Sequence, residues 1–367
     1  MAPAKILAIK LRALGDTVLM TAPLLEISRA YPQAELHVAV TKAWAPVMEG
    51  VPGVRKIWTY ERHKEKTARA RALARFAYRL RKEKFDCVLN FHASPSTATL
   101  AWAIGAKTRS IHFHGHRDRN RYSTVIVPGK GVLKPIIERD MDTLRALGVH
   151  VPAGRYPKLF LQPAEIREAD ETLARLGLEG QTLGLSLGAS RPTKSWPIDR
   201  FASLAIEWCQ KTPGGVLALA APQETEILKQ FLKTVDDLLV STVESVAQRA
   251  AIRTRIQGTC SLSIRGLASI LSRLKVLAGN DSGPRHIAVA VDTPTVTLFG
   301  PENPFEWHPY PLDRHPYLFI ENLPCRQDAD PGMPPWCGLH LCTIEEHRCM
   351  RQIGVQAVLK ACMEVCS

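Results

Sequence analysis

Three short stretches of the sequence place polar side chains between a strand-like run and a helix-like run. The first is "LRALGD" at residues 11–16, where Gly15 suits a tight turn and Asp16 falls near the start of the next helix. A carboxylate there either takes a proton from a reacting hydroxyl, as a general base, or simply caps the helix. The two roles conflict, because a helix N-terminus stabilises the ionised carboxylate and lowers its basicity.

The second stretch is "SLGASRPTKSWP" at residues 186–197. It offers Ser190, Thr193 and Lys194 ahead of a helix expected to start near Pro197. Hydroxyls, backbone N–H groups and one ammonium at a helix N-terminus suit a diphosphate. The GxxxxGK[ST] spacing of a Walker A loop is missing, and an ordinary capped loop remains the alternative.

The third stretch is "GNDSGPRHIA" at residues 279–288. Asp281, Ser282 and Gly283 predict a tight loop, Pro284 suits the first helical turn, and His286 lies in that turn. This set is typical of a site for phosphate and ribose, whereas a buried core histidine is the alternative for His286. All three stretches occupy the same position, after a strand and before a helix.

The elements that must position these residues follow a repeating pattern. Strand-like runs such as "KILAIKL" and "FDCVLNF" alternate with helix-like runs, which we expect at Thr17 to Ala30 and Ala43 to Glu49 among others. This alternation predicts parallel sheets with helices on both faces. It restarts after a proline-bearing linker at residues 151–166. Two such domains are expected for a chain of 367 residues, and ligands of open parallel sheets bind beyond the carboxyl ends of the strands.

Composition narrows the protein class. The chain is 46% hydrophobic and 23% charged, and it has no apolar run of the roughly 18 residues that a membrane helix requires. No secretory signal precedes the first strand, so we expect a cytoplasmic protein. The net charge of +13 is concentrated in residues 1–150, where 26 Lys and Arg face 12 Asp and Glu. This excess indicates an anionic partner or a solubilising surface.

The C-terminal tail contains several cysteines. Cys325, Cys337, Cys342 and Cys349 are separated by 11, 4 and 6 residues, which is no standard zinc-finger spacing. A structural zinc site, free thiols and a disulfide are all open alternatives.

Taken together in this order, the motifs resemble glycosyltransferase family 9, the heptosyltransferases that build the inner core of lipopolysaccharide. The resemblance rests on "KILAIKLRALGDTVLMTAPLLEISRAYPQAELHVAV", "FDCVLNFHASPSTATLAWAIGAKTRSIHF", "GASRPTKSWPIDRFASLA" and "DSGPRHIAVAVDTPTVTLFGP", and it covers nearly the whole chain. It implies an α/β protein of the GT-B fold, with two Rossmann-like parallel-sheet domains facing a central cleft. Residues 1–160 would bind the acceptor, residues 161–323 the nucleotide-sugar, and the Cys-rich tail 324–367 would end in a helix packed back across the domains.

The resemblance also implies a mechanism. Such an enzyme is an inverting glycosyltransferase that moves heptose from ADP-heptose to the Kdo-lipid A acceptor, with Asp16 as general base. No cofactor would be required, because a lysine neutralises the departing diphosphate. At "DSGPRH" the family pattern leads us to expect a smaller or apolar residue where Arg285 stands. The donor-binding residues would be Ser190, Thr193, Lys194, Glu226 (with Glu224 as the second choice), Asp281, Ser282, Gly283 and His286.

The acceptor would be an anionic, lipid-linked saccharide. We expect Arg12, Arg117, Arg119 and Arg121 to contact it. The basic helix at residues 63–84 would provide peripheral contact with the inner leaflet of the inner membrane, or else be a solvated amphipathic helix. The alternatives are transfer of a different nucleotide-sugar, transfer to a protein acceptor, or a non-catalytic nucleotide- or RNA-binding module. We expect no nucleic-acid partner, because no aromatic stacking platform is evident.

Overall fold

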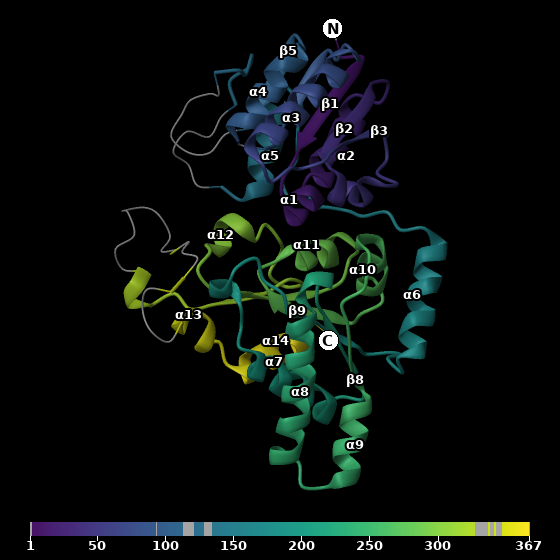
Figure 1. Ribbon diagram of the computed structural model, residues 1–367, viewed down its shortest axis with the longest axis vertical. Helices are drawn as coiled ribbons and strands as arrows, with labels where there is room; N and C mark the ends of the chain where they lie inside the picture. Colours follow the sequence, from purple (N-terminus) through teal and green to yellow (C-terminus); the bar gives the residue numbers. More distant parts are fainter. Residues whose placement is uncertain are drawn as a thin grey trace. The chain divides into compact units, whose positions relative to one another are not determined.

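The structure is a computed structural model, and it describes residues 2–92, 94–112, 121–127, 134–326, 337, 341–342 and 347–366. The chain divides into two compact units, Met1–Phe160 and Leu161–Ser367. Each unit is a parallel sheet with helices on both faces (Figure 1). The sequence pattern therefore predicted the architecture of each unit correctly. Within the described residues, no helix is long and apolar enough to cross a membrane.

The sheet of the first unit has five strands in the order β3-β2-β1-β4-β5. The chain builds outward from β1 to β3 and then returns to the other side of β1. The switch point of this sheet therefore lies between β1 and β4, where ligands of doubly wound sheets bind. The elements are β1 (Lys5–Lys10), α1 (Leu14–Leu19), α2 (Thr21–Ala30), β2 (Glu35–Thr41), the 3₁₀ helix η1 (Lys42–Met48), β3 (Val54–Tyr60), α3 (Lys66–Arg81), β4 (Cys87–Asn90), α4 (Pro95–Ile104), β5 (Thr108–Ile111) and α5 (Ile136–Arg145).

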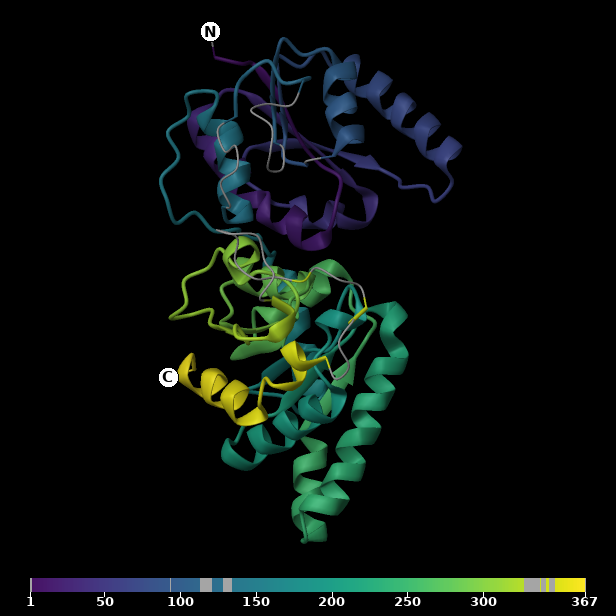
Figure 2. The same cartoon turned by 90° about the vertical axis from the view of Figure 1, so that its left-hand side faces the viewer.

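The second unit repeats this plan with six strands in the order β11-β10-β9-β6-β7-β8, and its switch point lies between β6 and β9. The long helix α8 and the shorter α9 lie side by side (Figure 2). Its elements are α6 (Pro163–Arg175), β6 (Leu183–Ser186), η2 (Pro192–Lys194), α7 (Ile198–Lys211), β7 (Val216–Leu219), η3 (Pro222–Glu224), α8 (Thr225–Thr242), α9 (Val246–Thr254), β8 (Ile256–Thr259), α10 (Ile264–Leu271), β9 (Val276–Asn280), α11 (Gly283–Ala290), β10 (Thr295–Phe299), α12 (Pro304–Trp307), β11 (Tyr317–Phe319), η4 (Pro324–Arg326), α13 (Arg348–Arg351) and α14 (Val355–Glu364).

The first helical segment differs from its prediction. We expected one helix from Thr17 to Ala30, but α1 already begins at Leu14, and α2 follows it as a separate helix. Pro23 explains the break, because a proline in a helix interior lacks an N–H and its ring collides with the carbonyl four residues earlier. Pro23 instead occupies the first turn of α2, where no intrahelical donor is needed. The expected helix at 43–49 is the 3₁₀ helix η1.

The last helix, α14, belongs to the core of the second unit. Four of its residues, Val358, Leu359, Ala361 and Cys362, are buried there. Its main contacts are with α7, β9 and β10. These contacts extend the core of the second unit beneath the strands that end at the switch point. The expected packing of this helix across both domains stays a prediction.

Candidate active site

Asp16 lies just beyond the carboxyl end of β1, in the first turn of α1 (Figure 1). The N-cap position belongs to Ala13, and no side chain caps this helix. Ala13, rather than Gly15, takes the left-handed backbone of the bend, with φ of 26°. Among the described residues, no group donates a hydrogen bond to the Asp16 carboxylate. The capping alternative is therefore wrong, and the carboxylate stands at the switch point of the first sheet without a hydrogen-bond donor from the described chain.

Opposing effects set the pKa of Asp16. Desolvation by the surrounding protein is the largest, and it raises the pKa. The cations of Lys10, Arg139 and Arg12 lower it, whereas the negative charge of Asp140 raises it. The net result is a pKa above the usual value for an aspartate. Desolvation therefore outweighs the nearby cations, and the raised pKa is the direction that favours proton abstraction.

A buried polar network lies at the same edge of the first sheet. Lys10, the last residue of β1, donates from its Nζ to both carboxylate oxygens of Asp140, at 2.8 and 3.1 Å. His112, which follows β5, places its Nδ1 3.3 Å from Asp140 Oδ1. All three side chains are no more than 3% exposed. Sequence reasoning missed this network, although a lysine that ends an apolar central strand was a usable signal.

Two further side chains at this edge each have a nitrogen without a hydrogen-bond partner among the described residues. Asn90 ends β4, is fully buried, and accepts a hydrogen bond at its Oδ1 from the backbone N–H of His92. Its Nδ2, and the Nδ1 of His92, have no hydrogen-bond partner within the described part of the chain. Burial lowers the pKa of His92 to about 4, so its ring is neutral near pH 7. Such groups are available to hold the hydroxyls of a ligand.

The second unit gathers its polar groups around Asp281, which follows β9. Its Oδ2 accepts a hydrogen bond from the Lys194 ammonium at 2.6 Å. Its Oδ1 accepts two from the Arg285 guanidinium at 2.6 and 2.9 Å. Although burial alone would raise the pKa of Asp281, Arg285 and Lys194 together hold it well below its usual range. The aspartate is thus an ionised clamp for two cations.

Arg285 stands where a smaller or apolar residue was expected, and the structure shows what it does. Its side chain is 3% exposed. The guanidinium donates to the Trp307 carbonyl at 2.8 Å and lies over the rings of Phe299 and Tyr310. His286 makes its own hydrogen bond to the Tyr310 hydroxyl and is buried, so its pKa is well below the usual value. His286 is therefore a neutral, partly structural residue in this environment.

Some of the other residues that we predicted to bind the donor lie next to this clamp. Lys194 has a second acidic neighbour, Glu302, at 3.4 Å. The hydroxyls of Ser186 and Ser282 lie 3.4 Å apart at the ends of β6 and β9. Gly283 opens α11, so its N–H belongs to the helix N-terminus. Outside this group, Ser190 is exposed and Thr193 is buried.

Comparison with known proteins now decides the family. The model of "Glycosyltransferase family 9 (heptosyltransferase)" matches residues 73–331, which is more than half of the chain. This chain belongs to glycosyltransferase family 9. The family 9 chain is similar to lipopolysaccharide heptosyltransferase 3 of Escherichia coli, with 22% identity over 81% of this chain and 83% of that protein.

Solved structures support the fold of the family 9 protein. The E. coli ADP-heptose lps heptosyltransferase II superposes with a TM-score of 0.73 at 18% identity, covering 99% of this chain and 98% of the other. E. coli heptosyltransferase WaaC with ADP-2-deoxy-2-fluoro heptose gives 0.61 at 17% identity, with coverage of 86% and 92%. The protein is thus a glycosyltransferase with two parallel-sheet α/β domains of GT-B type.

Two acidic residues of the family 9 enzyme are candidates for binding the ribose of the donor. Glu226 lies on α8, 84% exposed, and pairs with Lys229 at 2.8 Å. Glu224 ends η3, and a side chain at Gly188 would collide with its carboxylate. Because Gly188 lies just beyond β6 at the switch point, Glu224 rather than Glu226 lies at the edge of the sheet where the residues predicted to bind the donor are found.

The acceptor arginines are only partly described. Arg12 is exposed in the loop between β1 and α1, and it is among the cations that act on Asp16. Arg121 is exposed and lies over the Tyr122 ring, 4.6 Å from its centroid. Arg117 and Arg119 fall outside the described residues.

The described part of the C-terminal tail contains no group of side chains that could bind a metal ion. Cys325 and Cys342 are exposed, whereas Cys337 and Cys349 are half-buried. Across the described ranges, no three His, Cys, Asp or Glu residues group in a way that could hold a metal ion. Several neighbours of these cysteines lie outside those ranges, so the zinc site stays a prediction.

The Asp281 clamp predicts a strong, pH-dependent effect on stability. We expect Asp281→Asn to lower the free energy of unfolding by about 3–5 kcal/mol at pH 7, because it removes the carboxylate that neutralises the buried Arg285 guanidinium and the nearer acidic partner of Lys194. The folded-state pKa of Asp281 is lowered, so its contribution is complete above the unfolded value of 3.8 and is lost as the pH falls through the folded value. Urea unfolding, followed by the fluorescence of the buried Trp196 and Trp208, measures this.

The control for this prediction is Asp292→Asn. Asp292 is 89% exposed and pairs with Arg314 at 3.2 Å, so the same chemical change should leave stability almost unaltered. If both variants unfold alike, or if the loss in Asp281→Asn persists undiminished well below pH 3.8, the clamp is not the stabilising element described above.

Proposed function

We propose that this family 9 enzyme transfers heptose from ADP-heptose to an anionic, lipid-linked saccharide of the lipopolysaccharide inner core, with inversion. The observation that carries the proposal is Asp16, a carboxylate of raised pKa at the switch point of the first sheet with no donor from the described chain. The similar WaaC structure contains ADP-2-deoxy-2-fluoro heptose, and this ligand supports the choice of donor.

In the proposed reaction, Asp16 accepts the proton of the acceptor hydroxyl. The hydroxyl oxygen forms a bond to the anomeric carbon, and the bond from that carbon to the β-phosphate oxygen breaks. ADP leaves with the bonding electron pair. An inverting transfer needs only this one base, since a single displacement has no covalent intermediate.

The second unit would hold the departing ADP. The N-terminus of α11, with Ser282 and Gly283, suits the diphosphate because its N–H groups are unpaired donors. Lys194 would neutralise the charge that develops on the leaving group. Asp281 holds this ammonium in place rather than contacting the donor, so the lysine needs little rearrangement when the donor arrives.

Replacement of the base tests the proposal directly. We expect Asp16→Asn to lower kcat for transfer from ADP-heptose to Kdo-lipid A by a factor on the order of 10²–10⁴, the usual contribution of a general base. ADP binding, measured by calorimetry, should be unchanged because the donor residues lie in the other unit. Full activity in Asp16→Asn would exclude this base, and a preference of the wild type for UDP-GlcNAc or GDP-mannose would exclude the donor.

The two candidate ribose ligands can be separated by matched substitutions. We expect Glu224→Ala to raise the KM for ADP-heptose about tenfold, as the loss of a charged hydrogen bond would. Glu226→Ala should leave KM unchanged, because that carboxylate points into solvent and pairs only with Lys229 among the residues described. Steady-state kinetics on both variants, with thermal melting to check folding, make the comparison. The reverse ranking would return the role to Glu226.

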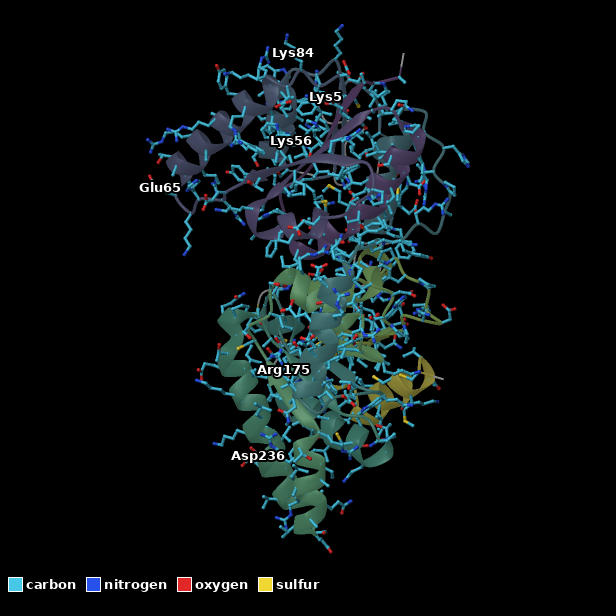
Figure 3. All side chains as sticks on the ribbon, turned by 90° about the vertical axis from the view of Figure 1, so that its right-hand side faces the viewer. Lys5, Lys56, Glu65, Lys84, Arg175 and Asp236 are labelled. Carbon is cyan, nitrogen blue, oxygen red and sulfur yellow. The ribbon has the colours of Figure 1, made fainter. Side chains whose placement is uncertain are left out.

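We also propose that α3 attracts the enzyme to an anionic membrane surface. Phe76, Ala77 and Leu80 are buried against the sheet, so the basic side chains lie on the outer face of the helix. Glu65 and Lys84, which flank α3, lie at its opposite ends in Figure 3. This arrangement also agrees with a solvated amphipathic helix, so the two alternatives need a binding experiment.

Co-sedimentation with vesicles distinguishes these alternatives. Replacing Arg71 and Arg75 by Gln should weaken binding to phosphatidylglycerol vesicles by up to about 1 kcal/mol per residue and leave the weaker binding to phosphatidylcholine unaltered. Lys229 and Lys233 on α8 have the same spacing and charge, so their replacement by Gln is the matched control. Equal losses in both double variants would indicate a general charge effect and reject α3 as the contact.

A further inference from the structure

The edge of the first sheet contains two carboxylates and one deeply buried ammonium. Asp16 belongs to α1, Asp140 to the middle of α5, and Lys10 to the end of β1. A buried ammonium needs a negative partner, because desolvation makes an unpaired charge very unfavourable. Lys10 donates to both carboxylate oxygens of Asp140, at 2.8 and 3.1 Å. Of the two carboxylates, Asp140 is therefore the one that forms the ion pair with the Lys10 ammonium.

The Asp140 carboxylate is held in place by the elements and side chains around it. Asp140 is fully buried, and α5 packs against α2, β4 and β5. His112 also approaches Asp140 Oδ1, to 3.3 Å. The backbone carbonyl of Asp140 also accepts a hydrogen bond from the Thr143 hydroxyl at 2.6 Å. These contacts hold the Asp140 carboxylate, and with it the Lys10 ammonium, in the buried ion pair.

We propose that Asp140 is a positioning residue that retains the Lys10 ammonium in a buried ion pair and thereby keeps Asp16 free to accept the proton of the acceptor. The proposal rests on the function proposed above for Asp16. Without Asp140, the ammonium would have Asp16 as its remaining acidic neighbour. An ion pair between Lys10 and Asp16 would occupy the oxygen that must receive the proton.

The charges that face Asp16 come from three segments. They are Lys10 on β1, Arg12 in the following loop, and Arg139 and Asp140 on α5. The three cations lower the pKa of Asp16, and Asp140 alone among these neighbours raises it. Loss of the Asp140 charge should therefore lower the pKa of Asp16, and loss of Lys10 should raise it, whether or not Asp140 then takes up a proton.

The pH dependence of kcat/KM tests this in the full-length enzyme, because its acid limb follows the essential base of the free enzyme. We expect Asp140→Asn to move the acid limb to lower pH by about one unit, the effect of an opposite charge left close to a carboxylate. The plateau rate should fall on the order of threefold, since a weaker base removes the proton less effectively. Lys10→Met should move the limb to higher pH, and the double variant should fall between the two.

Asp142→Asn is the matched control. Asp142 is on the same helix and equally charged and buried, but it pairs with Lys134 and Arg145 instead of facing Asp16. The acid limb of the kcat/KM profile of Asp142→Asn should stay at the wild-type position. A purely structural role for Asp140 would reduce activity and thermal stability without opposite shifts in the two single variants, and that result would overturn the proposal.

Two further outcomes keep the proposal open to rejection. If Asp140→Asn does not fold, Lys10→Met still decides, because an unshifted or lowered acid limb in that variant contradicts the proposal. If Asp16→Asn retains full transfer activity, the proposed role of Asp16 as the base is wrong. If Asp16→Asn is inactive but the acid limbs of the Asp140 and Lys10 variants do not shift, Asp16 remains the base and only the positioning role of Asp140 is rejected.

Discussion

Each unit has a lysine that is paired with an aspartate at the switch point of a parallel sheet, and the mechanism that we propose depends on these two ion pairs. In the first unit the pair is Lys10 and Asp140, with both side chains almost fully buried. In the second it is Lys194 and Asp281, where the lysine is 13% exposed. The strand ends at such an edge bring several polar side chains close together. A charged side chain that is buried there needs an oppositely charged partner, because an unpaired buried charge is strongly unfavourable.

The two pairs have opposite consequences. In the mechanism that we propose, the first withdraws the Lys10 ammonium from Asp16, which keeps the Asp16 carboxylate basic. The second presents an ammonium beside a helix N-terminus, which favours an anion. Arg285 reinforces the second pair by binding the other oxygen of Asp281, and its contacts with Trp307 and Phe299 fix the guanidinium. A residue that departs from the expected pattern thus strengthens the site.

Much of the fold followed from local sequence, because buried parallel strands such as Lys5–Lys10 and Thr295–Phe299 are apolar runs between turn residues. The position of Asp16 after β1 and of Asp281 after β9 followed in the same way. The break between α1 and α2 was missed, although Pro23 signals it in the sequence. Pairings such as Lys10 with Asp140 are separated by 130 positions, and no local pattern indicates which distant aspartate a lysine meets.

The choice between Glu224 and Glu226 shows the same limit. Both residues lie at the start of one helical segment, two positions apart, and they are separated by the proximity of Glu224 to Gly188 and by the exposure of Glu226. Helical geometry turns side chains two positions apart to different faces, so a small error in the expected helix start changes which carboxylate faces the site.

Three histidines of the second unit are buried, and burial keeps their rings neutral. Burial lowers the pKa of His308 to about 3 and of His315 to about 4, and that of His286 is well below its usual value. These three rings stay neutral around pH 7, so their contribution to the electrostatic field around Lys194 is constant there. A change of pH near neutrality therefore leaves the charge of these three rings, and their effect on the ion pair of Lys194 with Asp281, unaltered.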